Sequence, residues 1–287
     1  MAIGTQAAID AIIVGALAED APWGDVTGEA FIPATAQASV QLVAREPGIC
    51  SGLDVFTRVF ELVLEDAVTV ETQLQAGERF AAGQALARLS GQARGILRAE
   101  RVALNLMQRM CGIATITASY VAAVEGTGVR IVDTRKTMPG LRLLDKQAVR
   151  DGGGYNHRYS LSDAVMAKDN HLAVLLAQGM SIGDAIRSAR EKLPHTTSME
   201  VEVDRLDQIE EVVAAGVNTI MLDNFSFSDL RSGVALVAGR ALIEASGGIT
   251  MDSVAQVART GVDIISVGAL THSVRNLDLG LDINVRT

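Results

Sequence analysis

The chain has 287 residues and is acidic, with 25 lysines and arginines against 34 aspartates and glutamates and a net charge of -9. This balance excludes the broadly basic face with which proteins bind nucleic acid. No apolar run approaches the roughly 20 residues needed to span a bilayer, and the start of the chain lacks the basic region of a signal peptide. Two cysteines, Cys50 and Cys111, are too few for a disulfide framework, which indicates buried thiols in a cytoplasmic protein.

The first part of the chain has the mixed helix and strand pattern of an α+β domain. The pattern predicts an amphipathic helix over residues 1–20, strands over 39–46 and 67–74, a helix over 54–65, a turn-rich hairpin over 76–92 and a long helix over 94–124. We expect an α+β domain over residues 1–112, with the tail from about 273 to 287 packing back on it.

From about residue 128 onward, short β-rich runs alternate with helical stretches. The runs are residues 129–134, 164–171, 199–204, 218–224, 241–248 and 264–270. Between them, apolar residues recur at three- and four-residue spacing, as Ile209, Val212 and Val213 do. This alternation predicts a parallel sheet covered by helices, either a doubly wound sheet or an α/β barrel.

The ends of these β runs favour the barrel. In a doubly wound sheet only a few strand ends reach the ligand crevice, whereas in a barrel all of them meet at one mouth. Here nearly every run ends in polar or glycine-rich residues: Asp133, Arg135, Lys136, Lys168, Asp169, Asn170, Glu202, Asp204, Asp223, Asn224, Glu244, Ser246, Gly247, Gly248 and Gly268. We therefore favour an α/β barrel over residues 113–272, with six clear strands and one doubtful strand, so that closure into eight strands is left open.

Cations gather in residues 133–171. This segment holds three of the four lysines, Lys136, Lys146 and Lys168, together with Arg135, Arg142, Arg150, His157 and Arg158. In an acidic chain such a cluster predicts a pocket for a dicarboxylate or a phosphorylated sugar, because arginine binds carboxylates bidentately and lysine supplies a point charge. The alternative is a solvated charged loop. Next to Arg158, His157 is expected to stay neutral and to have one hydrogen bond to donate, unless it is a structural histidine.

Two further features point to phosphate and metal. Residues 244–249 and 267–273 place small residues after consecutive β runs, where barrels bind phosphate with backbone N–H groups. Glu202 and Asp223 end consecutive runs and would lie side by side, where carboxylates and substrate phosphates could hold Mg²⁺. The competing interpretation is that both acids pair with the cationic cluster.

Together these segments resemble quinolinate phosphoribosyltransferase, the carboxylating nicotinate-nucleotide pyrophosphorylase family. DTRKTMPGLRLLDKQAVRDGGGYNHR, AKDNH, EVEVD, LDNF, EASGGI and VGALTHSV follow the family's order, and GDVT at 24–27 and ERVALNLMQRMCGIAT at 100–115 extend the likeness over nearly the whole chain. Ala167 and Met138 depart from the more familiar residues, which we expect to affect packing only. A related family associated with molybdenum transport tends to lack the full NHR and KDNH signatures, and nicotinate phosphoribosyltransferases match these motifs less well.

The resemblance implies an N-terminal α/β sandwich domain, an incomplete, TIM-like α/β barrel, and a homodimer with sites shared between subunits, higher assemblies being left open. It also implies a reaction that joins quinolinate to 5-phosphoribosyl-1-pyrophosphate with Mg²⁺. The products are nicotinate mononucleotide, pyrophosphate and CO₂, a step of NAD biosynthesis. The alternatives are a phosphoribosyltransferase for another aromatic acid and a binding relative without turnover.

The resemblance also implies a role for each site residue. Arg135, His157, Arg158, Lys168 and Arg101 of the partner subunit would bind the carboxylates of quinolinate. Lys136 would act toward the pyrophosphate or the departing carboxylate, and Glu202 and Asp223 would hold Mg²⁺, so these three are the expected catalytic residues. The 5-phosphate would bind at Ser246, Gly247, Gly248 and Gly268.

Overall fold

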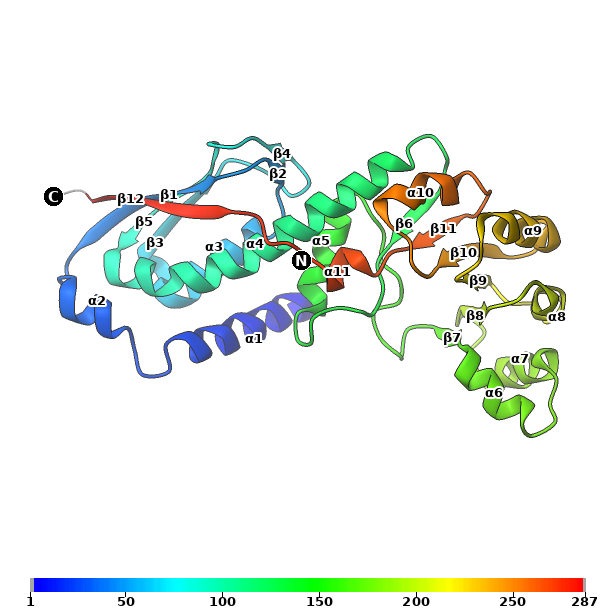
Figure 1. Cartoon of the computed structure of the whole chain (residues 1–287). Helices are drawn as coiled ribbons and strands as arrows, with labels where there is room; N and C mark the ends of the chain where they lie inside the picture. The colour runs from blue at the N-terminus through cyan, green and yellow to red at the C-terminus, as the bar shows by residue number, and fades with distance from the viewer. Residues whose placement is uncertain (1–2, 286–287) are drawn as a thin grey trace. The chain divides into compact units, whose positions relative to one another are not determined.

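A computed structural model describes residues 3–285 of the chain, which divide into two compact units (Figure 1). Unit 1 comprises the residues up to Ala118, Thr137–Gly153 and the residues from Leu270 onward. Unit 2 comprises Ser119–Lys136 and Gly154–Ala269. Within the described residues, no helix is both long enough and apolar enough to cross a membrane.

Unit 1 is built on a four-stranded antiparallel sheet of order β12-β1-β5-β3. Its strands are β1 (Gln37–Ala44), β2 (Gly48–Ile49), β3 (Val68–Thr72), β4 (Arg79–Phe80), β5 (Ala85–Gln92) and β12 (Leu279–Val285), of which β2 and β4 form a separate pair. Its helices are α1 (Ile3–Asp20), α2 (Val26–Phe31), α3 (Leu53–Leu64), the main part of α4 (Ala93–Ala123), α5 (Arg142–Asp151) and most of the short α11 (Ala269–His272).

The core of unit 1 follows from the spacing of apolar residues. In α3, Val55, Phe56, Val59 and Phe60 are fully buried at the three- and four-residue spacing of one helix face. The rings of Phe56 and Phe60 lie 5.0 Å apart between centroids. In β1, Val40 and Leu42 alternate with half-buried residues, as expected for a strand with one face on the core.

The last strand joins elements from opposite ends of the sequence. β12 runs antiparallel to β1, from Ala44 opposite Leu279 to Ala38 opposite Val285. The side-chain amide of Gln108 on α4 donates to the carbonyl of Leu279 at 2.8 Å. The four-stranded sheet of unit 1 is therefore complete only after β12 has been synthesised.

The segment with α5 lies in unit 1, although the predicted boundary at residue 112 assigned it to the barrel. Asp145 of α5 is fully buried and accepts two hydrogen bonds of 2.8 Å from Arg109 of α4. Ser51 Oγ donates to Asp151 at 2.6 Å. A Cβ added at Gly152 would lie 2.4 Å from the carbonyl oxygen of Ala114, so the backbone approaches α4 as closely as glycine allows. A buried ion pair and close packing hold this segment where sequence periodicity could not place it.

Unit 2 is a six-stranded, all-parallel sheet of order β6-β11-β10-β9-β8-β7 with helices between its strands. The strands are β6 (Arg130–Val132), β7 (Val165–Ala167), β8 (Met199–Val203), β9 (Thr219–Asp223), β10 (Leu242–Ser246) and β11 (Ile264–Ser266). The helices are α6 (Asp169–Leu176), α7 (Ile182–Glu191), α8 (Ile209–Ala214), α9 (Phe227–Val237) and α10 (Met251–Ala258). The predicted α/β fold is confirmed, and each predicted β run holds one strand.

The barrel is incomplete between β6 and β7, the two edge strands of this sheet. Here the chain makes only an isolated parallel bridge between Val132 and Tyr155. The run predicted over residues 164–171 forms a strand only as far as Ala167, because Lys168 caps α6. Its backbone N–H donates to His171 Nδ1 at 3.0 Å, so the KDNH segment begins a helix.

Candidate functional site

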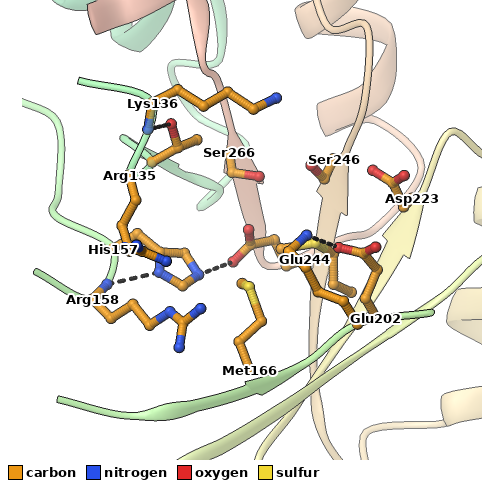
Figure 2. Close-up of a pocket in the computed structure, with 13 residues that line it drawn as sticks. Arg135, Lys136, His157, Arg158, Met166, Glu202, Asp223, Glu244, Ser246 and Ser266 are labelled. Atoms are coloured by element: carbon orange, nitrogen blue, oxygen red, sulfur yellow. Dashed lines mark hydrogen bonds and ion pairs between the residues drawn. The ribbon is translucent and has the colours of Figure 1, made fainter. Parts of the chain in front are cut away.

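A cavity of about 380 Å³ lies at the carboxyl ends of the strands of unit 2 (Figure 2). It is lined by Thr134, Arg135, Lys136, His157, Arg158, Met166, Lys168, Glu202, Met221, Asp223, Glu244, Ser246 and Ser266. Five of the six strands contribute lining residues or are directly followed by them, and Thr134 to Lys136 come just after β6. The convergence of strand ends on one mouth, predicted from the sequence, is the geometry that the structure has.

The acidic and hydroxyl side chains of the cavity come from the ends of neighbouring strands. Asp223 and Ser246 are the last residues of β9 and β10 and lie directly opposite each other in the register. Glu202 on β8 is opposite Met221, so Glu202 and Asp223 are diagonal neighbours on the same face. Parallel strands thus bring the two predicted metal-binding carboxylates to one wall.

The cations Arg135, Lys136 and Arg158 come from two loops on another part of the cavity. Arg158 donates through Nη1 to the carbonyl of Ala164 at 3.0 Å. Burial, and next the charge of Arg135, lower the pKa of Arg158 below its usual range. Arg135 Nε is buried and has no hydrogen-bond partner among the described residues. Two guanidinium groups that repel each other in a partly buried site favour the binding of an anion.

The loop that carries His157 and Arg158 is fixed to the end of β6. Asp133 is fully buried and accepts hydrogen bonds from Asn156 Nδ2 at 2.6 Å and from the His157 backbone at 2.8 Å. Farther along, Asp163 accepts from the backbone of Tyr159 at 2.6 Å. These bonds hold the NHR segment rigidly beside the cavity, although it lies outside regular secondary structure.

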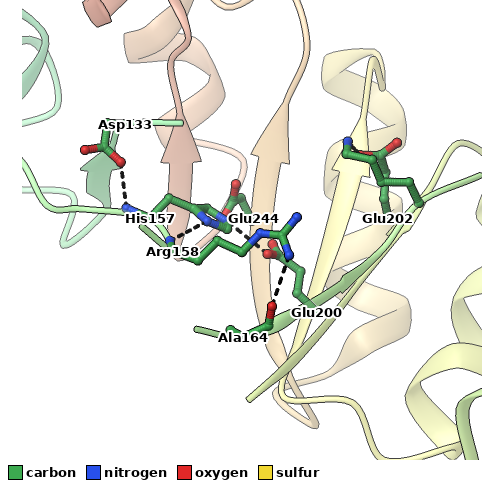
Figure 3. Close-up of polar contacts among 8 residues, drawn as sticks. Asp133, His157, Arg158, Ala164, Glu200, Glu202 and Glu244 are labelled. Atoms are coloured by element: carbon green, nitrogen blue, oxygen red, sulfur yellow. Dashed lines mark hydrogen bonds and ion pairs between the residues drawn. The ribbon is translucent and has the colours of Figure 1, made fainter. Parts of the chain in front are cut away.

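His157 lines the cavity and has a protein partner at each ring nitrogen. Its Nδ1 accepts the backbone N–H of Arg158 at 2.7 Å, and its Nε2 lies 2.9 Å from Glu200 Oε2 (Figure 3). The ring lines the cavity, but its N–H faces a carboxylate of the protein itself. The backbone of Arg158, and not its positive charge, therefore selects the ring nitrogen that stays unprotonated.

At the mouth, Lys168 Nζ forms an ion pair with Glu202. Pairing with the cationic cluster, which the competing interpretation expected of both acids, is therefore present for Glu202. Asp223 accepts from Asn224 Nδ2 at 2.7 Å, and Asn224 is one of the few non-glycine residues with a positive φ, 58°.

The predicted phosphate residues are divided. Ser246 lines the cavity, whereas Gly247, Gly248 and Gly268 lie just beyond the ends of β10 and β11 and do not line it. Gly247 has a φ of 90°, and a Cβ there would lie 2.2 Å from Asn224 Oδ1, so only glycine fits this corner.

Some predicted cations lie elsewhere. Arg101 is exposed on α4 in unit 1 and is not a lining residue of this cavity. Arg142, Lys146 and Arg150 lie on α5 of unit 1, where Lys146 is buried. The cationic segment of the sequence is therefore shared between two units, and Arg135, Lys136, His157, Arg158 and Lys168 are the part of it that lines the cavity.

The sequence interpretation missed Glu200 and several lining residues, and it named Glu244 as a polar strand end without giving it a role. Glu200 lies two residues before Glu202 on β8, and Glu244 lies two residues before Ser246 on β10. Because side chains in a strand alternate between faces, each of these glutamates points to the same face as its functional neighbour. This period of two was the signal that could have identified them. The same period of two marks Met166, Met221 and Ser266, which lie two residues before Lys168, Asp223 and Gly268. Thr134 lies in the loop after β6, where no such period applies.

The fit of a divalent metal depends on the ligands available. Glu202 and Asp223 offer hard oxygen ligands of the kind that Mg²⁺ takes, but Glu202 already pairs with Lys168. Among the described residues, one group brings three ligand atoms within 4.8 Å of one another, namely His157, Glu200 and Glu244. Two carboxylates alone do not complete an octahedral site, so Mg²⁺ fits here with most of its ligands coming from substrate and water.

Comparison with known proteins gives consistent results. Residues 25–111 match the quinolinate phosphoribosyl transferase N-terminal domain, and residues 113–282 match the C-terminal domain of the same family. The chain is 45% identical to the nicotinate-nucleotide pyrophosphorylase [carboxylating] of Mycobacterium leprae, over 93% of this chain and 94% of that protein. It is 40% identical to the probable enzyme of the same name from Bacillus subtilis, over 93% and 90% of the two chains.

Solved structures agree. The crystal structure of NadC from Streptococcus pyogenes superposes with a TM-score of 0.92 at 42% identity and covers 97% of both chains. The nicotinate-nucleotide pyrophosphorylase of Francisella tularensis gives a TM-score of 0.89 at 35% identity over 96% of each chain. With both family domains present in order and relatives matched over nearly their full length, the chain belongs to the quinolinate phosphoribosyl transferase family.

Proposed function

We propose that this chain transfers the phosphoribosyl group of 5-phosphoribosyl-1-pyrophosphate to quinolinate and releases CO₂, giving nicotinate mononucleotide and pyrophosphate for NAD biosynthesis. The enzyme is a pentosyltransferase. One observation supports this most strongly: a single cavity has guanidinium and ammonium groups on one part of its wall and carboxylates and a serine on another. A dicarboxylate and a sugar diphosphate need both kinds of wall.

The cationic residues suit the two carboxylates of quinolinate. Arg135 and Arg158 can bind carboxylates bidentately. Lys168 lines the same cavity and is half-exposed, so it can leave Glu202 and bind a substrate carboxylate instead. Arg135 Nε, buried without a partner among the described residues, gains one when an anion binds. Binding of an anion therefore gives the Arg135 Nε donor a partner and reduces the repulsion between the two guanidinium groups.

The chemistry requires positioning more than proton transfer. The pyridine nitrogen of quinolinate already has a lone pair, so no general base has to activate the nucleophile. Attack on the ribose forms the nitrogen–carbon bond and breaks the bond to pyrophosphate. The ring nitrogen then bears a positive charge and can stabilise the electron pair that remains on the ring carbon when CO₂ leaves. A proton from water then binds to that carbon and completes nicotinate mononucleotide. Lys136 supplies preorganised positive charge for the groups that depart.

Mg²⁺ is part of the proposal, with Glu202 and Asp223 as the residues that would hold it, directly or through water. The ion would neutralise charge on the pyrophosphate. Removal of divalent cations with a chelator is expected to abolish turnover, and added Mg²⁺ is expected to restore it. Glu202→Gln should raise the Mg²⁺ concentration at half-maximal rate; an unchanged requirement would remove Glu202 from the metal site.

We also propose that the active form is a homodimer in which Arg101 of the partner subunit completes each site. Support comes from the exposed position of Arg101 on α4 and from family membership. A mixture of Arg101→Ala and Arg135→Ala chains should recover part of the activity that each lacks, because some heterodimers keep one intact site. No recovery at any ratio would contradict shared sites.

One assay tests the main proposal against its alternatives. Purified protein should form nicotinate mononucleotide and CO₂ from quinolinate, and nicotinate should be a poor substrate because it lacks the second carboxylate. Equal kcat/KM for the two acids would indicate another aromatic acid as substrate. Tight quinolinate binding by calorimetry without CO₂ would indicate a binding protein.

We infer the cellular location of the enzyme from the state of its two cysteines. Cys50 and Cys111 are buried free thiols, and burial raises the pKa of each to about 12, so both are unreactive. Such thiols suit a reducing compartment, and we propose the cytoplasm.

A further inference from the structure

Beneath the charged mouth of unit 2 lies a second layer of polar side chains that the proposed reaction leaves unassigned. Glu200 on β8 and Glu244 on β10 are one strand period deeper than Glu202 and Ser246. Their exposed fractions are 7% and 2%. Figure 3 shows both carboxylates beside the His157 ring. We call His157, Glu200 and Glu244 the buried trio.

The ring of His157 has a defined tautomer in this layer. The backbone N–H of Arg158 can only donate, so Nδ1, which lies 2.7 Å away, is the unprotonated acceptor. The proton of a neutral imidazole is then on Nε2, which lies 2.9 Å from Glu200 Oε2 and 3.7 Å from Glu244 Oε2. Both ring nitrogens are thus directed at groups of the protein.

The remaining contacts show that the trio is built for fixed orientation. The backbone of His157 is held by Asp133 at 2.8 Å, so ring and main chain are both anchored. Within the described residues, Glu200 Oε1 and Glu244 Oε1 have no hydrogen-bond partner. Glu200 faces the ring with Oε2 at 2.9 Å, and Glu244 Oε2 lies 3.7 Å from it. Burial, and next the charge of Glu200, raise the pKa of Glu244 to about 8.

We propose that Glu200 and Glu244 are positioning residues that lock the His157 imidazole in its Nε2–H tautomer, as a rigid wall of the quinolinate site. Quinolinate carboxylates then bind Arg135, Arg158 and Lys168, and the imidazole N–H stays on Glu200. Glu200 is the hydrogen-bond acceptor, and Glu244 confines the ring from β10, two strands away from β8 in the sheet. This inference rests on the proposed function for its effect on quinolinate, but the tautomer itself does not.

The spectroscopic test needs no substrate. The chain has only four histidines, so ¹⁵N-histidine labelling of the full-length protein gives few signals, and a His157→Gln variant assigns those of His157. We expect one unprotonated nitrogen, Nδ1, and one protonated nitrogen, Nε2, in a single tautomer at neutral pH. Two protonated nitrogens, or averaging between tautomers, would overturn the proposal.

Two substitutions of similar size separate positioning from general stability. Glu200→Gln keeps an oxygen acceptor for Nε2–H and should keep the tautomer and a quinolinate KM within roughly 3-fold of the parent. Glu200→Met fills the same space without an acceptor, so the signals should average and the quinolinate KM should rise roughly 10-fold or more, as for a buried donor left unsatisfied. The KM for the phosphoribosyl donor should change far less.

Equal behaviour of the Gln and Met variants would refute the positioning role. If Glu200→Met does not fold, the parent spectrum still decides whether the tautomer is as inferred. If the parent protein forms no nicotinate mononucleotide at all, the proposed function fails, and the spectra alone then confirm or overturn the locked tautomer.

Discussion

Two ion pairs, one in each unit, show how burial separates structural charge from functional charge. In unit 1, Arg109 and Asp145 have side chains that are 15% and 0% exposed. In unit 2, Lys168 and Glu202 are 45% and 10% exposed. The residue types are alike, and both pairs are close enough for direct hydrogen bonds.

The difference lies in what else each pair touches. Arg109 binds Asp145 through two parallel hydrogen bonds and also donates to the carbonyl of Thr271 at 3.0 Å. Asp145 in turn accepts the backbone N–H of Met138 at 3.3 Å. We call the unit 1 pair closed, because protein groups take up its hydrogen bonds and little of it reaches solvent. The Lys168–Glu202 pair is open, because Lys168 is half-exposed beside a cavity. A closed pair holds segments together; an open pair can change partners when an anion arrives.

The largest expected effect is on the closed pair. Arg109→Ala leaves a buried carboxylate at Asp145 without its cation, so the free energy of unfolding should fall by about 3–5 kcal/mol. Urea unfolding followed by circular dichroism measures the change. Arg187→Ala is the matched control, because its pair with Asp184 is more than half exposed, and it should cost less than about 1 kcal/mol. Equal losses would show that burial does not distinguish the pairs.

The second effect should appear in activity with little change in stability. Lys136→Ala removes preorganised positive charge from the cavity, and kcat should fall on the order of 10²-fold or more. Lys192→Ala removes an exposed lysine of the same unit and should leave kcat unchanged. Near-parental turnover by Lys136→Ala would show that this lysine is not part of the catalytic site.

Fold and site were predictable from the sequence to different degrees. The strand–helix alternation after residue 128 and the polar strand ends predicted the sheet and its mouth, because both depend on local periodicity. The position of α5 was not predictable, since it depends on one long-range ion pair between Arg109 and Asp145. The pairing of β12 with β1 likewise joins residues more than 200 positions apart.

Within the site, the sequence predicted which charged residues line the cavity better than it predicted how their side chains are oriented. Arg135, Arg158 and Lys168 line the cavity as expected, since each follows a strand or sits in its loop. The hydrogen-bond partners of the His157 ring could not be inferred from the sequence, because they depend on how the ring is oriented toward the Arg158 backbone and toward Glu200. The role of Arg101 stays a prediction that the chain mixture tests.

A third prediction concerns a buried carboxyl group without a cation of its own. Burial raises the pKa of Glu244 from 4.5 to about 8, so between these pH values the folded chain binds more protons than the unfolded chain. The free energy of unfolding should therefore decline as pH rises from about 5 to 8, by on the order of 2 kcal/mol from this group.

Glu244→Gln removes that titration and keeps the shape of the side chain. Urea unfolding at several pH values should show a flatter dependence for this variant than for the parent. Glu71→Gln changes an exposed glutamate of unit 1 and should reproduce the parent curve. Parallel curves for the parent and Glu244→Gln would mean that Glu244 does not stay protonated when the chain folds.

The smallest effect on the free energy of unfolding is expected for an ion pair that is exposed, as Lys168 is, but does not line the cavity. Arg45 and Asp282 join β1 to β12 with side chains 44% and 50% exposed, and their Nη1–Oδ2 distance is 3.3 Å. Asp282→Asn keeps the side-chain shape, so the free energy of unfolding should fall by about 0–1 kcal/mol and the loss should shrink in high salt. A loss as large as that of Arg109→Ala would mean that the extent of burial does not set the strength of these pairs. A small loss, with the seven residue pairings of β12 with β1 intact in hydrogen exchange, would show that main-chain bonds and apolar contacts hold the last strand on the sheet.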